Sequence, residues 1–238
     1  MSEDLKNYLD NIKKPWGVLF YKMVWKQLSW AKGMKILDFG SGFGITSNYL
    51  AKENEVIAIE PNEAMVNMRE QENDYTQIVG DIEKLKELEG EKFDLVICHN
   101  VLEYANERED IVRQLVRVLK KNGKLSIVKH NHTGRIMQKV IFENNVDEAL
   151  SLLDGGDIEV MNFGKVNYYY NDEILKWEIN LKIDKTYGVR TFWGLQQNNE
   201  IKSEKSWQEK MFEVEKKVCE IEEYKNISFF NHIIFIKD

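Results

Sequence analysis

Short apolar runs alternate with amphipathic segments along most of the chain. Five of the runs are bounded by Gly, Asn or Pro and are short enough to be buried strands. They cover residues 34–40, 55–61, 76–82, 93–100 and 122–130. Segments with helical periodicity follow the first, second and fourth runs, at residues 44–53, 63–72 and 108–121. This alternation predicts a parallel sheet with helices on both faces.

The alternation breaks between Thr133 and Asn171 and then resumes. We expect residues 133–171 to form a partly helical insertion over one edge of the sheet, on the substrate side. Beyond it, the pattern predicts a helix at 171–179, a strand at 187–195, a helix at 203–224 and a strand at 230–238. Residues 15–28 are aromatic-rich and amphipathic at helical spacing, which predicts that residues 1–32 form a helical lid or alternatively pack against the sheet edge. Since no linker or repeat interrupts the sequence, residues 1–238 are interpreted as one domain.

The composition narrows the class of protein. The chain has 238 residues, is 43% apolar and carries a formal net charge of −7. The acidic balance argues against broad non-specific binding of nucleic acid, although a local basic patch stays open. Cys98 and Cys219 lie in apolar runs, as buried free thiols of a reducing compartment do. The N-terminus has no apolar signal core, and residues 227–236 are too short to span a bilayer. We therefore expect a cytoplasmic protein without a membrane partner.

The stretch ILDFGSGFG, from Ile36 to Gly44, places three glycines directly after the first predicted strand. Glycine permits a positive φ and lets a ligand approach the backbone. In an open parallel sheet, ligands bind beyond the carboxyl ends of the strands, where the helix that follows offers free N–H groups. A tight strand-to-helix turn without a ligand is the alternative. The spacing G-x-G-x-G also differs from the G-x-G-x-x-G fingerprint of nicotinamide dinucleotide sites, the competing nucleotide interpretation.

Polar residues end consecutive predicted strands in otherwise apolar surroundings. Glu60 ends the second strand, where a carboxylate can accept both hydroxyls of a ribose, and Asp81 ends the third, within reach of an adenine amino group. Asp38 lies inside the first strand and, if buried, needs turn amides or a ligand's ammonium as partners. His99 ends the fourth strand, either as a ligand contact or as a strand-end hydrogen bonder. Together these residues predict a nucleotide-type site at one edge of the sheet.

These motifs resemble those of the class I S-adenosylmethionine (SAM)-dependent methyltransferases. The resemblance covers Met34 to about Val128 and rests on ILDFGSGFG, IAIEPNEAM, VGDIEKL, FDLVICHNVLEY and LVRVLKKNGKLSIV. It implies an α/β, Rossmann-like mixed sheet of seven strands, with the last strand antiparallel, helices on both faces and a partly helical insertion. It also implies SAM as the cofactor, bound by Asp38, Gly40, Ser41, Gly42, Gly44, Glu60, Pro61, Met65, Asp81, Ile82 and His99.

A narrower similarity points to an acceptor. Residues 99–141 and the later stretch YGVRTFWGL are similar to the bacterial tRNA 5-carboxymethoxyuridine methyltransferases, which esterify the carboxylate of a modified wobble uridine. The resemblance implies such a tRNA as the acceptor. Because a carboxylate needs a cation to hold it rather than a base to activate it, Arg190 and Arg135 are predicted catalytic residues. Tyr169 joins them as an aromatic ring on which a base can stack.

Other interpretations stay open. The acceptor is alternatively a small metabolite that is methylated on oxygen or nitrogen, which would require a base such as His, Asp or Tyr near the methyl group. A SAM-binding protein without catalysis is the third possibility. Arg190 is alternatively a surface ion-pair partner, and Tyr169 a residue of the core. His130 and His132 would share one side of a strand, but no Cys or carboxylate completes a metal site there, so no metal is expected.

Overall fold

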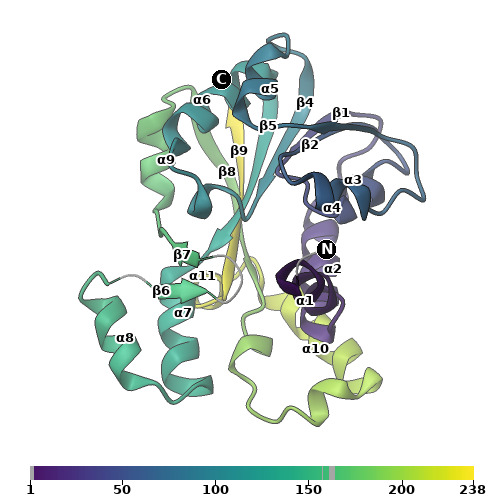
Figure 1. Ribbon diagram of the computed structural model, residues 1–238. Helices are drawn as coiled ribbons and strands as arrows, with labels where there is room; N and C mark the ends of the chain where they lie inside the picture. The colour runs from purple at the N-terminus through teal and green to yellow at the C-terminus, as the bar shows by residue number, and fades with distance from the viewer. Residues whose placement is uncertain (1–2, 157, 161–163) are drawn as a thin grey trace. The chain divides into compact units, whose positions relative to one another are not determined.

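The computed structural model describes residues 3–156, 158–160 and 164–238, with helices and strands labelled in Figure 1. The chain divides into two compact units. Unit 1 comprises Met1–Gln27, Lys129–Tyr168 and Thr186–His232, and unit 2 comprises Leu28–Val128, Tyr169–Lys185 and Ile233–Asp238. Each unit gathers segments from distant parts of the sequence, and three strands contribute residues to both. The single domain that the sequence suggests therefore stays a prediction.

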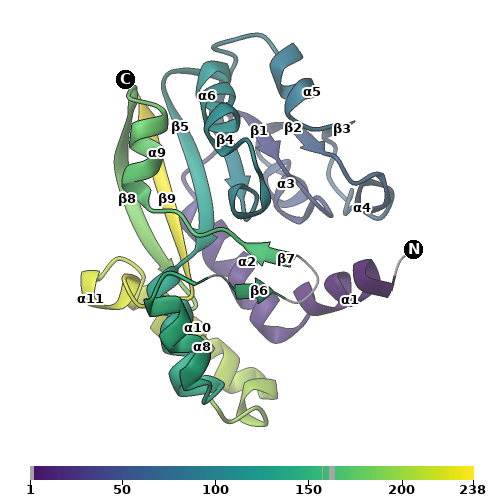
Figure 2. The ribbon, with the colours of Figure 1, turned by 60° about the vertical axis from the view of Figure 1, so that its left-hand side comes forward.

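A seven-stranded sheet has the strand order β3-β2-β1-β4-β5-β9-β8. Its strands are β1 (Lys35–Phe39), β2 (Glu55–Glu60), β3 (Thr76–Val79), β4 (Phe93–His99), β5 (Leu119–His130), β8 (Leu181–Val189) and β9 (Phe230–Lys237). The first five strands pair in parallel and form the row from β3 to β5 in Figure 2. The last strand is antiparallel, which confirms the predicted Rossmann-like mixed sheet.

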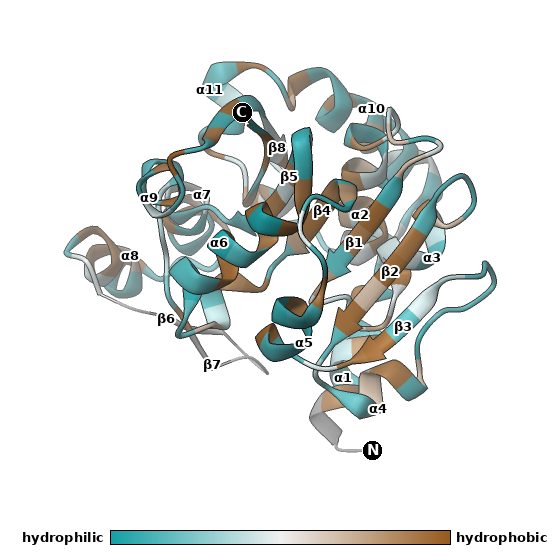
Figure 3. Ribbon diagram, turned by 90° about the horizontal axis from the view of Figure 1, so that it is seen from above, coloured by the Kyte–Doolittle hydropathy of each residue, from teal (hydrophilic) through white to brown (hydrophobic). Residues whose placement is uncertain are grey.

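The order of the strands in unit 2 reverses at β1. The chain moves outward from β1 to β3 and then returns to β4 on the other side of β1. Because such crossovers are right-handed, the helices before and after the return cover opposite faces, as α3 and α6 do in Figure 3. The helices of this unit are α3 (Ile45–Leu50), α4 (Glu63–Asn67), α5 (Ile82–Glu87), η1 (Leu102–Tyr104), α6 (Arg108–Val118) and α9 (Asn171–Trp177). The topological switch point therefore lies between β1 and β4.

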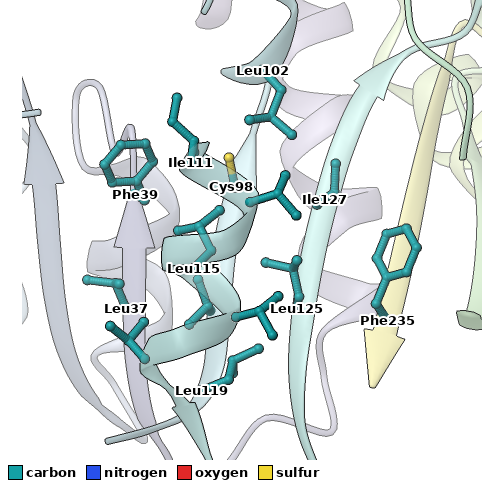
Figure 4. Close-up of a cluster of buried hydrophobic side chains, with 14 of the residues drawn as sticks. Leu37, Phe39, Cys98, Leu102, Ile111, Leu115, Leu119, Leu125, Ile127 and Phe235 are labelled. Atoms are coloured by element: carbon teal, nitrogen blue, oxygen red, sulfur yellow. The ribbon is translucent and has the colours of Figure 1, made fainter. Parts of the chain in front are cut away.

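Helix α6 buries its apolar stripe against the sheet. Ile111 and Leu115 of α6 pack into one cluster with Leu37 and Phe39 of β1 and with Cys98 of β4 (Figure 4). Each of these side chains is at most 5% exposed. Since full burial of such a side chain contributes about 1.5–3 kcal/mol, the cluster holds the ends of β1 and β4 together at the switch point.

Unit 1 is mainly helical outside the three shared strands. Its elements are α1 (Glu3–Ile12), α2 (Pro15–Gln27), α7 (His132–Met137), the π-helical turn η2 (Gln138–Phe142), α8 (Val146–Leu153), the antiparallel pair β6 (Ile158–Val160) and β7 (Gly164–Val166), η3 (Trp193–Leu195), η4 (Ile201–Ser203), α10 (Lys205–Val218) and α11 (Glu222–Lys225). The described part of the predicted lid, residues 1–32, is largely helical, and its closing action stays a prediction. The segment 133–171 contains helices, and its residues 157 and 161–163 lie outside the described residues.

Several element boundaries differ from the predicted ones. β5 begins at Leu119, before the expected turn at residues 122–123, because Leu119 pairs with Phe93 and the extra residues form a bulge in which Asn122 has φ 60°. α6 therefore ends at Val118.

The strand predicted at 187–195 is wrong beyond Val189, where β8 ends and a turn begins. The helix predicted at 203–224 is broken into α10 and α11. No helix in the described ranges is both long and apolar enough to cross a membrane.

Candidate functional site

The turn after β1 lies against the segment that follows β4. β1 and β4 are hydrogen-bonded neighbours, with Asp38 opposite Ile97. The Cβ atom that Gly40 lacks would lie 2.3 Å from Cγ2 of Val101. Gly40 also has φ 77°, so both its backbone and its surroundings exclude a side chain. The glycine motif thus forms a tight turn at the edge where parallel sheets bind ligands.

Gly42 is the glycine of this turn with the most room beside it. Among the residues that the structure describes, a Cβ atom built on Gly42 would meet only Sδ of Met65, at 4.0 Å, whereas one on Gly44 would lie 2.1 Å from the Tyr75 hydroxyl. The N–H groups of Gly40 and of Ser41 both donate to the carbonyl of Ile59 and are used within the fold. The N–H of Gly42 is also used, by Glu60, so what Gly42 offers a ligand is the room left by its missing side chain, beside Met65.

Glu60 ties the glycine turn to the end of β2. Its side chain is buried; Oε2 accepts a hydrogen bond of 2.8 Å from the N–H of Gly42, and Oε1 accepts one of 2.8 Å from Asn62. Pro61 lies between these contacts, and Asn62 caps α4 by accepting from the N–H groups of Ala64 and Met65. Each carboxylate oxygen has further acceptor capacity, so Glu60 can also accept ligand hydroxyls.

Asp38 is a buried acid with one hydroxyl partner. Its Oδ2 accepts a hydrogen bond of 2.6 Å from Oγ of Ser47 in α3, so the protein supplies a hydroxyl where turn amides were predicted. Burial raises the pKa of Asp38 to about 6, the Ser47 bond lowers it in part, and the charge of Glu60 raises it further. A cation beside this carboxylate would oppose the effect of burial, which makes the position suitable for an ammonium group.

Asp81 and Ile82 stand together at the end of β3. Asp81 is exposed and caps α5, where its Oδ1 accepts a hydrogen bond of 3.0 Å from the N–H of Glu83. Ile82 begins α5 and packs, partly buried, against the hydrophobic core. The hydrogen-bond acceptor Asp81 and the apolar Ile82 thus lie side by side, which suits the polar edge and the flat face of a purine ring.

Two residues at the end of β4 belong to the candidate site: His99, which the sequence predicts, and Asn100, which it does not. Nε2 of His99 lies 2.8 Å from Oγ of Ser126 in β5. Asn100 has φ 53°, and its Oδ1 is buried without a hydrogen-bond partner among the residues that the structure describes. A buried carbonyl oxygen without a donor is costly, so Asn100 is a candidate acceptor for a ligand N–H group. Its sequence signal was weak: Asn tolerates a left-handed backbone, but a single Asn after a strand does not reveal one.

Arg190 and Arg135 belong to a cationic cluster in unit 1. The guanidinium groups of both lie over the ring of Phe229, at 4.9 Å and 5.6 Å from its centroid. Arg190 is only 8% exposed, which does not suit a surface ion-pair partner. Burial lowers the pKa of Arg190 to about 10, the charge of Glu215 raises it, and Arg135 lowers it. Within the described ranges, Nε of each arginine has no hydrogen-bond partner. Nη1 of Arg135 already donates to Gln138 at 2.6 Å and lies 3.9 Å from Glu143, so the two Nε atoms are the donors that these observations leave for an anion.

His130 lies in the same cluster and is neutral. Burial lowers the pKa of His130 to about 3, with further lowering by the charges of Arg135, Arg190 and Lys129. Its ring packs against Phe229, with 5.7 Å between centroids. Such a weakly basic imidazole is poorly matched to accepting a proton near neutral pH.

Tyr169 lies in the hydrophobic core of unit 2. It is 2% exposed, and its ring centroid is 5.8 Å from that of Trp177 and 5.7 Å from the guanidinium of Arg108. Burial raises the pKa of Tyr169 well above its usual value, and the charge of the buried Glu103 adds to this. The contact of Tyr169 with an acceptor stays a prediction.

A large surface hollow of unit 2 is unrelated to the glycine turn. It has a volume of about 750 Å³ and lies at the amino-terminal edge of β1 and β2. Four of its charged residues form ion pairs: Lys35 with Glu55 at 2.6 Å, and Lys120 with Asp94 at 2.7 Å. Such solvent-exposed ion pairs are typical of an ordinary protein surface. The candidate site is therefore the opposite, carboxyl-terminal edge of the strands. In the described part of the chain, no three His, Cys, Asp or Glu side chains are grouped as metal ligands would be.

Comparison with known proteins shows which protein family this chain resembles. Residues 37–127 match a family model described as a methyltransferase domain. The ubiquinone biosynthesis O-methyltransferase of Histophilus somni is 29% identical over 153 residues, which are 60% of this chain. The chain spans 61% of the length of that relative.

Solved structures share the fold. A SAM-dependent methyltransferase from Mesorhizobium loti has a TM-score of 0.53 at 14% identity, covering 87% of this chain and 92% of its own. The 4+2 cyclase SpnF has a TM-score of 0.57 at 15% identity, covering 91% of this chain and 79% of its own. Over residues 37–127 the chain is therefore similar to a methyltransferase domain, and its fold is that of these solved structures.

Proposed function

We propose that the chain binds SAM at the glycine turn and transfers its methyl group to an acceptor. The observation that carries this proposal is the position of Gly42, Glu60 and Asp81 at consecutive strand ends of one parallel sheet. Glu60 would accept the ribose hydroxyls and Asp81 the adenine amino group, beside Ile82. The buried carboxylate of Asp38 would face the ammonium of the methionine part.

The methionine part would lie along the glycine turn. Gly42 leaves room beside Met65, and Gly40 brings the turn close to the segment after β4. On that segment, His99 and Asn100 would border the methionyl end. Asn100 would gain there the donor that its buried Oδ1 lacks among the described residues. In this proposal, the polar side chains at this edge of the sheet each contact one part of SAM.

Methyl transfer requires alignment more than a strong base. The acceptor's lone pair forms a bond to the methyl carbon while the carbon–sulfur bond breaks, and sulfur keeps the electron pair to give S-adenosylhomocysteine. The sulfonium is a good leaving group, so the protein mainly holds the acceptor in line with that bond and excludes water. A carboxylate is a sufficient nucleophile without losing a proton.

We further propose that the acceptor is a carboxylate, with that of a modified tRNA wobble uridine as the candidate. In unit 1, the buried Arg190 and the partly buried Arg135 each have an Nε without a hydrogen-bond partner among the described residues, and these donors can serve an anion. Neutral His130, the imidazole beside them, has a pKa too low for a good general base. Arginine pairs with carboxylates through charge-assisted hydrogen bonds, and nearby rings suit stacked bases. These features support a carboxylate over a hydroxyl that must be deprotonated.

Two rival functions have specific support. The curated relative is named for ubiquinone biosynthesis, which favours O-methylation of a small molecule. The cyclase with the same fold supports a non-methylating function, because a shared fold does not fix the reaction. Either rival would leave SAM binding at the glycine turn intact.

Calorimetry tests the cofactor site. Glu60→Ala removes a carboxylate that would make two charge-assisted hydrogen bonds to the ribose, each contributing about 1.5–3 kcal/mol. We expect the SAM dissociation constant to rise at least about 100-fold, with Glu63→Ala, an exposed change on α4, as the matched control. A parallel titration with NADH tests the dinucleotide alternative. Wild-type affinity for SAM in Glu60→Ala would remove Glu60 from the site.

Labelled SAM identifies the acceptor. The protein is incubated with methyl-labelled SAM and extract from a strain that lacks it, and tRNA, protein and small molecules are then separated. Label in tRNA that is lost on mild alkaline treatment indicates a methyl ester, as expected for a carboxylate acceptor. Label confined to small molecules would sink the tRNA proposal. Binding of SAM without transfer to any fraction would favour the non-methylating rival.

A further inference from the structure

The turn after β8 is built around one buried carboxylate. Glu215, in the C-terminal half of α10, is completely buried. Its Oε2 accepts a hydrogen bond of 2.8 Å from the N–H of Thr191. Its Oε1 accepts bonds of 2.8 Å and 3.0 Å from the N–H groups of Phe192 and Trp193. Three consecutive amides thus converge on one anion, as in the anion-binding nests of other proteins, with the anion supplied by the chain itself.

The residue just before these three amides is Arg190. Its φ is 61°, a left-handed conformation that is unfavourable for a residue with a long side chain and that persists only where its surroundings enforce it. The guanidinium is stacked between aromatic rings, 5.0 Å from the centroid of Trp16 and 4.9 Å from that of Phe229. The turn that Glu215 fixes therefore determines where the Arg190 side chain starts, and the rings determine where it ends.

Glu215 also balances the charge of Arg190 without using its donors. The carboxylate raises the pKa of Arg190, so the two charges interact. Both of its oxygens are nevertheless bonded to backbone amides, and Nε of Arg190 has no partner among the described residues. A direct ion pair would have occupied the donors that an acceptor anion needs.

We propose that Glu215 is a positioning residue for the acceptor: it holds Arg190 in its left-handed turn, with its charge compensated and its guanidinium donors available to a carboxylate. This inference rests on the proposed function of Arg190. A purely structural clamp would stabilise the turn without changing how strongly Arg190 binds an anion, and this difference can be measured.

The first test follows the Nε–H signal of Arg190 by nitrogen NMR during a titration with acetate, the smallest carboxylate probe. The signal is assigned by its loss in Arg190→Lys. In the wild type we expect a saturable shift of this signal. In Glu215→Gln we expect the affinity for acetate to be at least about 10-fold weaker, because the NH₂ group of the new amide would point at a backbone N–H of the turn, where two donors repel each other. Glu213→Gln removes an exposed charge from the same helix and should match the wild type. SAM affinity should be unchanged in all variants.

The possible outcomes separate the two proposals. Equal acetate affinity in Glu215→Gln and the wild type would overturn the positioning role and leave Arg190 as an anion site. A wild-type signal that acetate does not move would overturn both this inference and the carboxylate acceptor, whereas SAM binding reports on the cofactor site independently. Should Glu215→Gln fail to fold, Glu215→Asp keeps the charge on a shorter arm and should bind acetate with intermediate affinity; wild-type affinity there would count against the inference.

A double variant adds a kinetic readout. If Glu215 acts through Arg190, then Glu215→Gln should raise the KM for the methyl-accepting fraction in the wild-type background but add nothing in an Arg190→Lys background. If the two substitutions instead raised the KM independently, so that their effects multiplied in the double variant, the inference would be contradicted.

Discussion

The buried acid at the end of β1 makes a quantitative prediction about stability. Asp38 has a pKa of about 6 in the folded protein, against 3.8 as the ordinary value, chiefly because burial disfavours its charge. A pKa difference of about two units corresponds to about 3 kcal/mol at 1.36 kcal/mol per unit. Since the folded-state pKa is the higher one, the protein loses this stability as the pH rises from about 4 through 6. At neutral pH the ionised Asp38 therefore destabilises the unliganded fold.

Asp38→Asn removes the charge and keeps an oxygen that can accept from Ser47. We expect the variant to gain stability over the wild type by about 3 kcal/mol between pH 4 and pH 7.5, a rise of roughly 6–12 °C in the midpoint of thermal unfolding. The same change should weaken SAM binding, because the neutral amide no longer attracts the methionine ammonium. Thermal unfolding across this pH range and calorimetry with SAM measure the two effects.

The pH dependence is the decisive feature of this experiment. Asp74→Asn changes an exposed acid and should leave both the unfolding midpoint and SAM affinity close to those of the wild type. If the stability difference between Asp38→Asn and the wild type were the same at pH 4 and pH 7.5, the raised pKa would be refuted. If SAM bound the variant as tightly as the wild type, Asp38 would not face the ammonium.

Three further predictions concern single positions. Both Gly40 and Gly42 have a positive φ, so an alanine at either position should cost about 1 kcal/mol of stability. Gly40→Ala should lower stability by about 2 kcal/mol in all, because its Cβ would also meet Val101 at 2.3 Å, whereas Gly42→Ala should in addition weaken SAM binding. Thermal unfolding and calorimetry distinguish them, and a larger loss of stability in Gly42→Ala would contradict the room beside Gly42. Asn100→Ala should weaken SAM binding about 5–10-fold with little loss of stability, and an unchanged dissociation constant would mean that no ligand donor reaches its oxygen. Arg190→Lys should raise the KM for the acceptor at least about tenfold at constant SAM affinity, because lysine lacks the planar fork; equal KM values would exclude a bidentate contact.

The family match does not by itself choose among reactions on this fold. The cyclase and the methyltransferase that share it have similar TM-scores against this chain. The residues that we propose meet the acceptor, Arg190 and Arg135, lie outside residues 37–127, where the family model matches. The cationic cluster around Arg190 is therefore the part of the molecule where the function is best tested.

The sequence by itself determined the parallel part of the sheet and the edge at which its polar residues meet. Apolar runs and helical periodicity are local properties, so β1 to β4 could be predicted to within a few residues, together with helices after β1, β2 and β4. The helix α5 after β3 was not predicted, and the helix predicted at 63–72 ends already at Asn67. Glycines that need a positive φ are equally visible, as Gly40 and Gly42 show. Glu60 and Asp81 could be placed at one edge because parallel strands end on the same side of a sheet.

Tertiary structure alone decided how these groups are used. Glu60 bonds back to Gly42, Asp38 finds Ser47, and Asn100 keeps a buried oxygen without a partner among the described residues, each through contacts that no local pattern encodes. The strand predicted through Arg190 failed for the same reason. Its apolar run is typical of a strand, but the carboxylate of Glu215, 24 residues after Thr191, takes the amides that strand pairing would need. Hydrophobic pattern is a local property, whereas the partner of a buried polar group is chosen by the fold.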